Sequence, residues 1–416
     1  MSKLRYRPFL RCALLFSNFF LIITALYHLK PVSRSIFLEA IGSDLLPYVW
    51  IATALTLGAI VSFYYRLVAR YSRLHVVITS VLIVIALLVV FRPLLVDPDR
   101  ITAFAFYIFV DILSVVLVEQ FWSITNSVYS EEEGRRWYAF IGTGGLVGGV
   151  AGGLATGILI RQTSLQSTDL LLVAAAILSL LILLTMVMYR TGLYRDDHAK
   201  ENGRHVEEGS WRAVLSHRYL KLIAAIVLLA QIIEPLIEYQ FMTAIESAIS
   251  GREERTAYLG EFFSLLGLIA ISVNLLIVPV VHRWLGVMAG LAAQPLAVVV
   301  SSLFYISAPG LAAGAALKIA DRGLSYSINR ASKELLYASV NPLLIFQAKA
   351  WIDMFGYRLF RIIGSLLILL LTQWLPLSIA SQDLSWLVLL VCMLWGLSLV
   401  MLGREHARRM LHGEKS

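Results

Sequence analysis

Residues 169–217 read DLLLVAAAILSLLILLTMVMYRTGLYRDDHAKENGRHVEEGSWRAVLSH, and they contain the pattern that decides the fold. Their first part, 169–190, is an apolar run of the length that an α-helix needs to cross a hydrocarbon layer about 30 Å thick. Their second part, 191–217, is the longest polar interval of the chain and separates two nearly equal halves. A membrane-spanning helix followed by a polar linker predicts further spans before and after that linker.

The composition agrees with a membrane protein. Of 416 residues, 59% are hydrophobic and 15% are charged, whereas soluble domains carry about 25% charged residues. The apolar runs are about twenty residues long, which excludes an outer-membrane barrel with its strands of about ten residues of alternating polarity. We therefore expect an all-α polytopic membrane protein, with the lipid bilayer as its surroundings.

Windows of about twenty apolar residues predict twelve transmembrane helices. Six precede the linker and six follow it, so we expect a six-helix half over 1–190, a cytoplasmic linker over 191–217 and a second six-helix half over 218–416 with a short cytoplasmic tail. This plan is typical of major-facilitator-like transporters. The spans are 8–29, 44–65, 74–95, 101–126, 138–161, 169–190, 218–245, 257–281, 284–308, 309–333, 343–374 and 384–403.

The positive charges predict the orientation. The net charge of +8 is concentrated at the ends of spans, for example in Arg66, Arg70 and Arg73. Loops rich in Lys and Arg stay in the cytoplasm, so we expect both termini there. The Glu131–Arg136 loop lies on the cytoplasmic side in this scheme, and Arg252 with Arg255 runs against it. No soluble basic face is present, so nucleic acid is not expected as a partner.

The tenth span is unusual because it contains KIADRGLSYSINRASK, residues 318–333. Charges at bilayer depth cost roughly 2.5–3.5 kcal/mol each on insertion scales, so they are usually functional. On an α-helix, a spacing of three to four residues places side chains on one face. Such a face fits the lining of a path for an anion, and an internal ion-pair network is the alternative. The residues on this polar face are Lys318, Arg322, Tyr326, Asn329 and Lys333.

Other spans contain further charges. The eleventh carries a second stripe at four-residue spacing, made of Lys349, Asp353, Tyr357 and Arg361. The fourth ends at the polar segment that contains Asn126. Three carboxylates lie within apolar runs, and they could bind substrate, carry protons or pair with the basic residues. Lys30 and Arg34 would lie one turn apart if the first span continues past Pro31. The three carboxylates are Asp111, Glu234 and Glu238.

The fifth span, FIGTGGLVGGVAGGLATG, has glycines at four-residue spacing. It lacks the GKS or GKT ending of a phosphate-binding loop, so close packing of helices is the favoured interpretation. The sequence contains no nucleophile–base pair, metal-ligand cluster or dinucleotide motif. We therefore expect neither an enzyme, nor a cofactor, nor a metal site.

Three strings resemble the ATP/ADP translocases of plastids and obligate intracellular bacteria, the TLC-type family. They are LKPVSRSIFLEAIGSDLLPY, FWSITNSVYSEEEGRRWYAFIGTGG and SINRASKELLYASV with AKAWIDMFGYR. The resemblance implies a major-facilitator-like exchanger of ATP and ADP. It also implies charged residues in the translocation path, which fall on Lys333 and Glu238 by motif, and on Arg34 and Asp111 as shifted counterparts.

The leading hypothesis is a secondary transporter that moves nucleotides or related phosphorylated anions by alternating access, in ATP/ADP-type exchange. Phosphates would meet Lys318, Arg322 and Lys333, with Arg34 on the other half, while Asp111 and Glu238 would position the substrate or pair with these cations between states. We expect such a carrier in a bacterial inner membrane. Two alternatives remain: a proton-coupled carrier of another solute, and a non-transporting membrane scaffold or sensor. A monomer is the working expectation for the oligomeric state.

Overall fold

The computed structural model describes residues 7–129, 131–193, 214, 217–337, 348–349, 351–375 and 379–412. Every regular element in this part of the chain is a helix. Eleven of the described helices are long and apolar enough to cross a membrane. The predicted tenth span, 309–333, is helical from residue 311 onward. It contains too many charged residues to count among these eleven apolar helices. The prediction of an all-α, multi-pass membrane protein is confirmed.

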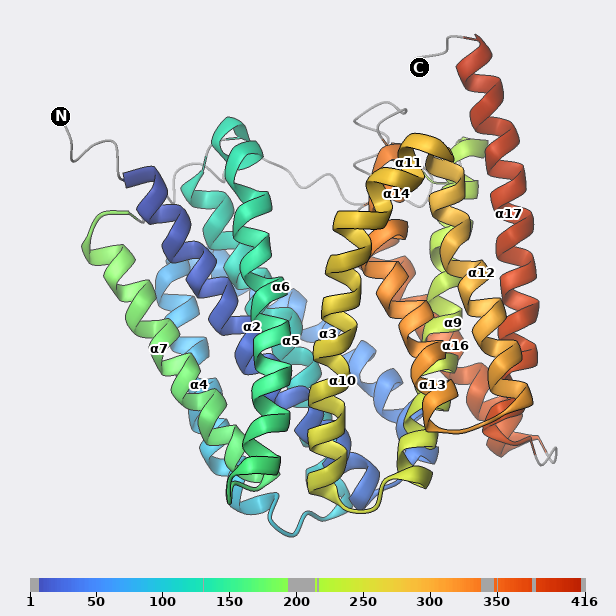
Figure 1. The fold of residues 1–416 in the computed structure, drawn as a ribbon. Helices are drawn as coiled ribbons and strands as arrows, with labels where there is room; N and C mark the ends of the chain where they lie inside the picture. The colour runs from blue at the N-terminus through green and yellow to red at the C-terminus, as the bar shows by residue number, and fades with distance from the viewer. Residues whose placement is uncertain are drawn as a thin grey trace. The chain divides into compact units, whose positions relative to one another are not determined.

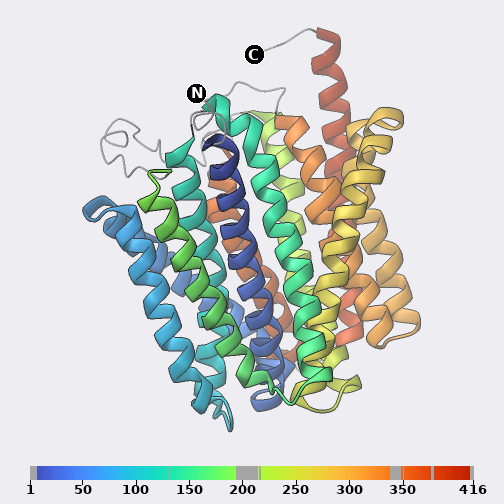
Figure 2. The same ribbon diagram turned by 60° about the vertical axis from the view of Figure 1, so that its left-hand side comes forward.

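The described residues form two compact units. The first consists of the described parts of Met1–Gly42, Ala52–Arg204 and Ile249–Gly267. Its helix α2 packs against α5, α6 and α7, and the three neighbours surround it in both views (Figures 1 and 2). The helices are α2 (Arg7–Ala40), most of α3 (Leu46–Arg70), α4 (Arg73–Leu94), α5 (Arg100–Val128), α6 (Glu131–Gln162), α7 (Leu170–Arg190) and the first part of α10 (Arg252–Ser272), with the short turn η2 (Ser167–Asp169).

The second unit consists of the described parts of Ser43–Ile51, His205–Ala248 and Leu268–Ser416. Its most buried helix is α9 (Arg218–Ala248), which packs against α13, α16 and α17 (Figure 1). The other elements are η1 (Ser43–Leu45), η4 (Val273–Ile277), α11 (Val278–Trp284), α12 (Gly286–Ser307), α13 (Leu311–Lys318), η5 (Ile319–Gly323), η6 (Ser325–Asn329), α14 (Arg330–Tyr337), η7 (Ile352–Gly356), α16 (Tyr357–Leu369), η8 (Leu370–Trp374), η9 (Ser381–Asp383) and α17 (Leu384–His412).

The units do not coincide with the predicted halves. Residues 249–267 follow the linker in sequence but belong to the first unit, and residues 43–51 precede it but belong to the second. Most of the linker, 194–213, lies outside the described residues. The division of the chain at 191–217 therefore stays a prediction.

Two element boundaries differ from the sequence prediction. Helix α2 continues through Pro31 to Ala40, so Lys30 and Arg34 are helical and do not lie in a loop. The residues predicted as the Glu131–Arg136 loop instead form the first turns of α6.

The glycine-rich span is a packing surface, as its spacing indicated. A Cβ added at Gly148 would lie 2.5 Å from the carbonyl oxygen of Phe20 on α2. One added at Gly153 would lie 2.5 Å from the carbonyl oxygen of Gly260 on α10. Helix α6 thus touches the backbones of α2 and α10 directly, which only glycine permits at these positions.

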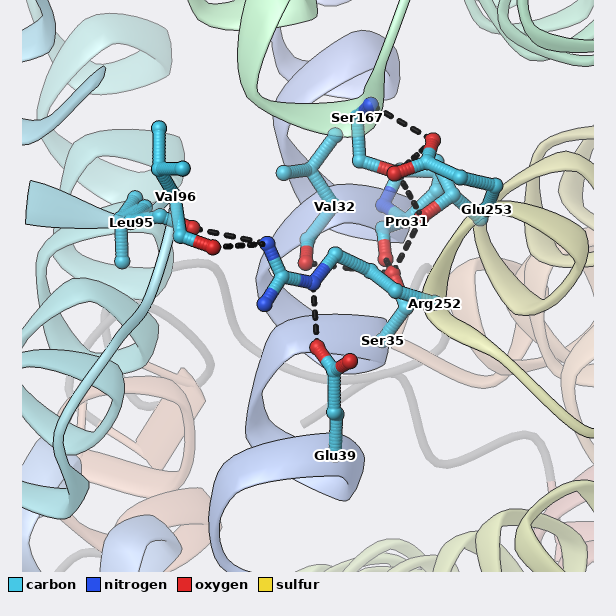
Figure 3. Close-up of polar contacts among 10 residues, drawn as sticks. Pro31, Val32, Ser35, Glu39, Leu95, Val96, Ser167, Arg252 and Glu253 are labelled. Atoms are coloured by element: carbon cyan, nitrogen blue, oxygen red, sulfur yellow. Dashed lines mark hydrogen bonds and ion pairs between the residues drawn. The ribbon is translucent and has the colours of Figure 1, made fainter. Parts of the chain in front are cut away.

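The start of α10 is fixed to the first unit by a polar cluster (Figure 3). Arg252 donates to the carbonyl oxygens of Leu95 at 2.8 Å and Val96 at 3.3 Å, and it pairs with Glu39 on α2. The next residue, Glu253, accepts hydrogen bonds from the backbone N–H and the hydroxyl of Ser167, both at 2.7 Å. These contacts join α10 to α2, to the α4–α5 connection and to η2.

Candidate functional site

An ion pair lies inside the first unit. The Nη2 atom of Arg34 on α2 lies 2.5 Å from Oδ1 of Asp111 on α5. The guanidinium also donates to the Ser33 hydroxyl at 2.8 Å and lies 4.4 Å from the centroid of the Tyr107 ring. The two charged side chains are only 10% and 13% exposed. The structure therefore brings together these two predicted residues, and the aromatic ring holds the guanidinium through its negative face.

A larger cluster lies inside the second unit, around two carboxylates one turn apart on α9. Lys318 pairs with Glu238, and Arg322 pairs with Glu234. The Nε atom of Arg361 on α16 lies 3.1 Å from the second oxygen of Glu234. Together with Asp321, these residues are called the Glu234 cluster: Glu234, Glu238, Lys318, Asp321, Arg322 and Arg361.

The Glu234 cluster is nearly enclosed. Glu234, Lys318 and Asp321 are each only 3% exposed. Charges removed from water to this extent need close partners, and pairing with opposite charges supplies them. Carboxylates from α9 engage the cations of the tenth span more closely than Asp321 does, since its Oδ2 lies 3.8 Å from Nε of Arg322.

A chain of amide hydrogen bonds continues from this cluster. Gln294 on α12 donates to Oδ1 of Asp321 at 3.0 Å and to its backbone oxygen at 3.2 Å. Asn329 in turn donates to the side-chain oxygen of Gln294. The predicted site residue Asn329 is therefore connected to the buried charges through Gln294.

Two π-helical turns, η5 and η6, interrupt the tenth span at its charged residues. Such turns are rare and occur frequently at functional sites. They change the register that an α-helix would give, so the residues predicted to share one face do not share one environment. Lys318 is 3% exposed, whereas Tyr326 is 55% exposed and lies beside the Arg322 guanidinium.

The remaining predicted residues of the second unit lie apart from the Glu234 cluster. The ammonium of Lys333 donates to the Tyr357 hydroxyl at 2.9 Å. Lys349 pairs with Glu334 at 2.8 Å, and both side chains are at least 37% exposed. The backbone of Asp353 lies in η7, but its side chain lies outside the described residues.

Two secondary candidates lie in the first unit. Lys30 is partly buried, and its ammonium lies 5.8 Å from the centroid of the Tyr27 ring. Asn126 is exposed near the end of α5.

The sequence placed Arg361 on the second stripe without naming it among the substrate-binding residues, and it did not single out Gln294. A signal was present for each: Arg361 lies at four-residue spacing after Tyr357, and Gln294 is an isolated amide in an apolar span. No group of three or more His, Cys, Asp or Glu residues that could hold a metal ion occurs in the part of the chain that the structure describes. The described site residues can therefore bind ionic groups of opposite charge.

The family model of the TLC ATP/ADP transporters matches residues 100–312, which is more than half of the chain. The chain belongs to this family. The matched region of this TLC-family protein contains Asp111, Glu234 and Glu238. Arg34 and the charged stretch of the tenth span, residues 318–333, lie outside it.

Curated relatives of this TLC-family protein are found in Rickettsia. The ADP,ATP carrier protein 4 of Rickettsia felis is 24% identical over 70% of this chain and 65% of its own length. The protein of the same name in Rickettsia conorii is 23% identical over 72% and 67%, respectively. The chain thus spans about two thirds of the length of these relatives.

Solved transporter structures share the fold of this TLC-family protein. A bacterial homologue of the iron transporter ferroportin, in an inward-facing state, matches with a TM-score of 0.64 at 12% identity and covers 94% of this chain and 98% of its own. A variant of the nucleoside transporter NupG matches with the same TM-score at 13% identity over 94% and 99%. These likenesses establish the major-facilitator-like fold that the six-plus-six plan predicted.

Proposed function

We propose that this protein is a secondary transporter that exchanges nucleotides or related phosphorylated anions across a bacterial inner membrane by alternating access. The names of the Rickettsia relatives support nucleotides as the substrate class. ATP and ADP are the first substrates to test. The proposal assigns no enzymatic step to the protein.

The Glu234 cluster carries this proposal. It contains three basic side chains within an apolar bundle, and two of them are guanidinium groups that share one carboxylate. Guanidinium groups bind phosphate oxygens with charge-assisted hydrogen bonds in a fixed planar geometry. Such an arrangement suits a phosphorylated anion better than a neutral or cationic substrate.

The pairing of these cations supports exchange. A buried ion pair contributes little net stability, because desolvation offsets most of the attraction, whereas removing one partner is strongly unfavourable. Arg322 and Arg361 can therefore pass from the Glu234 carboxylate to a substrate phosphate at small net cost. Release of one phosphate is easiest when another anion or Glu234 replaces it.

The topology follows from the charge distribution. We propose that both termini and the 191–217 linker lie in the cytoplasm, because several span ends are rich in Lys and Arg and such segments are usually retained there. A monomer in the lipid bilayer is the proposed working unit. Cysteine substitutions in the 66–73 and 191–217 segments, labelled with an impermeant reagent in whole cells, test this orientation.

Reconstitution tests the function. Proteoliposomes preloaded with ADP should take up labelled ATP, and empty proteoliposomes should take up much less. A panel of AMP, nucleosides, inorganic phosphate and sugar phosphates defines the class. Absence of uptake for every nucleotide, together with no nucleotide-dependent rise in thermal stability, would refute the proposal.

Arg322→Gln is the direct test of the cluster. Loss of one charge-assisted phosphate contact, about 1.5–3 kcal/mol, should weaken nucleotide affinity by roughly tenfold to a hundredfold. Glu234 keeps Arg361 as a partner at 3.1 Å, so the variant should still fold. Arg330→Gln, at an exposed position shortly after the π turns, is the matched control and should bind normally. Unchanged affinity in Arg322→Gln would make the cluster structural.

A further inference from the structure

Asp321 is a buried carboxylate with an incomplete set of partners. It lies in η5, between Lys318 and Arg322, and is 3% exposed. Its Oδ1 atom accepts the hydrogen bond from Gln294 at 3.0 Å. Its Oδ2 atom is buried without a hydrogen-bond partner among the described residues. The nearest ion-pair contact, to Nε of Arg322, is 3.8 Å long, which is too far for a hydrogen bond.

The two neighbouring carboxylates differ from Asp321. Glu238 is in direct contact with Lys318, and Glu234 is in contact with two arginines. A carboxylate that is buried and charged needs hydrogen bonds at both oxygens to offset the loss of water. Oε2 of Glu234 also lacks a hydrogen bond among the described residues, but Nε of Arg361 lies 3.1 Å from it, whereas the ion-pair contact of Oδ2 of Asp321 is 3.8 Å long.

Several elements place charged or polar groups around Asp321. Lys318 and Arg322 lie on its own segment, and Glu234 acts from α9. Helix α12 supplies the neutral Gln294, and the thiol of Cys392 on α17 is within electrostatic reach. Arg361 on α16 contacts Glu234. The cations therefore have closer carboxylate partners than Asp321.

We propose that Asp321 is a proton-binding site of the carrier and that its Oδ2 atom carries a proton at neutral pH. With Asp321 neutral, the Glu234 cluster has three cations against two carboxylates, which leaves one net positive charge. Loss of the proton would bring the cluster to neutrality and would place a negative charge beside Arg322.

The consequence for transport rests on the proposed function. A net positive cluster attracts a phosphorylated anion, whereas a neutral cluster does so less. Anion binding and proton binding at Asp321 should therefore favour each other, which is reciprocal coupling between two sites. The carrier would then take up its anion more tightly at low pH than at high pH.

Infrared spectroscopy of the purified full-length protein tests the proton directly and needs no substrate. A protonated carboxyl group has a carbonyl stretch that ionised carboxylates lack. We expect this band at neutral pH in the wild type, its loss in Asp321→Asn, and its retention in Asp169→Asn. Asp169 is a suitable control because Arg92 engages it at 2.7 Å outside the cluster.

Two results would overturn the proposal: no such band in the wild type at pH 7, or a band that persists in Asp321→Asn. If that variant does not fold, Gln294→Leu provides the second test. Removal of the amide that donates to Oδ1 should shift the band to higher frequency. A band that stays in place in Gln294→Leu would also overturn the assignment.

Uptake of labelled ATP by proteoliposomes tests the coupling. A unit charge in the interior changes anion affinity by about tenfold at distances near 10 Å. We expect at least that loss of affinity in the wild type as pH rises through deprotonation of Asp321, and less than a twofold change in Asp321→Asn. An equal pH dependence in both proteins would overturn the coupling. No ATP uptake at any pH would refute the proposed function and leave the infrared result standing.

Discussion

At the residue scale, each buried cation of the candidate site is held by a carboxylate from another helix. Arg34 on α2 pairs with Asp111 on α5, and Lys318 on the tenth span pairs with Glu238 on α9. The sequence indicates that these residues are expensive to bury. It does not indicate which acid partners which base, because the partners are far apart in the chain and meet only when the helices pack.

Substitutions at Lys318 and Glu238 separate stability from function. Glu238→Gln leaves a buried ammonium without its charge partner and should lower stability by about 3–5 kcal/mol. The double variant Lys318→Met with Glu238→Met replaces the pair by apolar side chains and should recover most of that loss, while transport stays lost. Thermal unfolding and ATP/ADP exchange of the same preparations provide both measurements.

The exposed pair of Glu334 and Lys349 is the matched control for this experiment. Glu334→Gln should cost less than about 1 kcal/mol, because solvent screens exposed ion pairs. A double methionine variant as unstable as Glu238→Gln would contradict the interpretation.

At the scale of elements, apolar length and glycine spacing made most of the fold predictable. A run of about twenty apolar residues can satisfy its backbone hydrogen bonds in a bilayer only as a helix. Glycines at four-residue spacing on α6 predicted close packing, which the approaches at Gly148 and Gly153 confirm. The π turns of the tenth span could not be predicted, because residue types do not encode a change of helical register.

Two glycines on α6 allow a controlled test of this packing. Gly148→Ala places a methyl group 2.5 Å from the backbone oxygen of Phe20, whereas Gly142→Ala meets nothing within 4 Å. We expect Gly148→Ala to lower the melting temperature clearly. Gly142→Ala should leave it unchanged or raise it slightly, because alanine favours helices over glycine by roughly 0.5–1 kcal/mol. Equal melting temperatures for the two variants would contradict direct backbone contact.

At the scale of the whole molecule, each compact unit contains residues from both sides of the linker. The first unit contains residues 249–267, which follow the linker. Within that unit, Arg161 on α6 pairs with Glu254 at 2.8 Å and with Glu261 at 3.1 Å. A six-plus-six division of the sequence could not reveal that residues 249–267 belong to the first unit. The polar contacts that hold the start of α10 leave no periodic pattern in the sequence.

Division of the chain at the linker tests this organisation. Residues 1–204 expressed alone lack a helix segment of their own unit, so we expect aggregation on size-exclusion chromatography in detergent. Co-expression with residues 205–416 should restore a single symmetrical peak. Arg252→Gln with Glu253→Gln in the second fragment removes contacts of the cluster in Figure 3 and should weaken reassembly. A monodisperse 1–204 fragment would contradict the prediction.

The π turns at 319–323 and 325–329 also have an evolutionary consequence. A π turn closes its hydrogen bonds over one residue more than an α turn. Deletion of a single codon in this stretch would convert one turn to α geometry and keep the helix intact. Because a π turn accommodates one extra residue within nearly the same rotation, the residues beyond it, including Lys333, would keep almost the same orientation relative to Lys318. A protein of this family can thereby gain or lose a residue in the middle of a charged helix while the side chains beyond it keep their orientation.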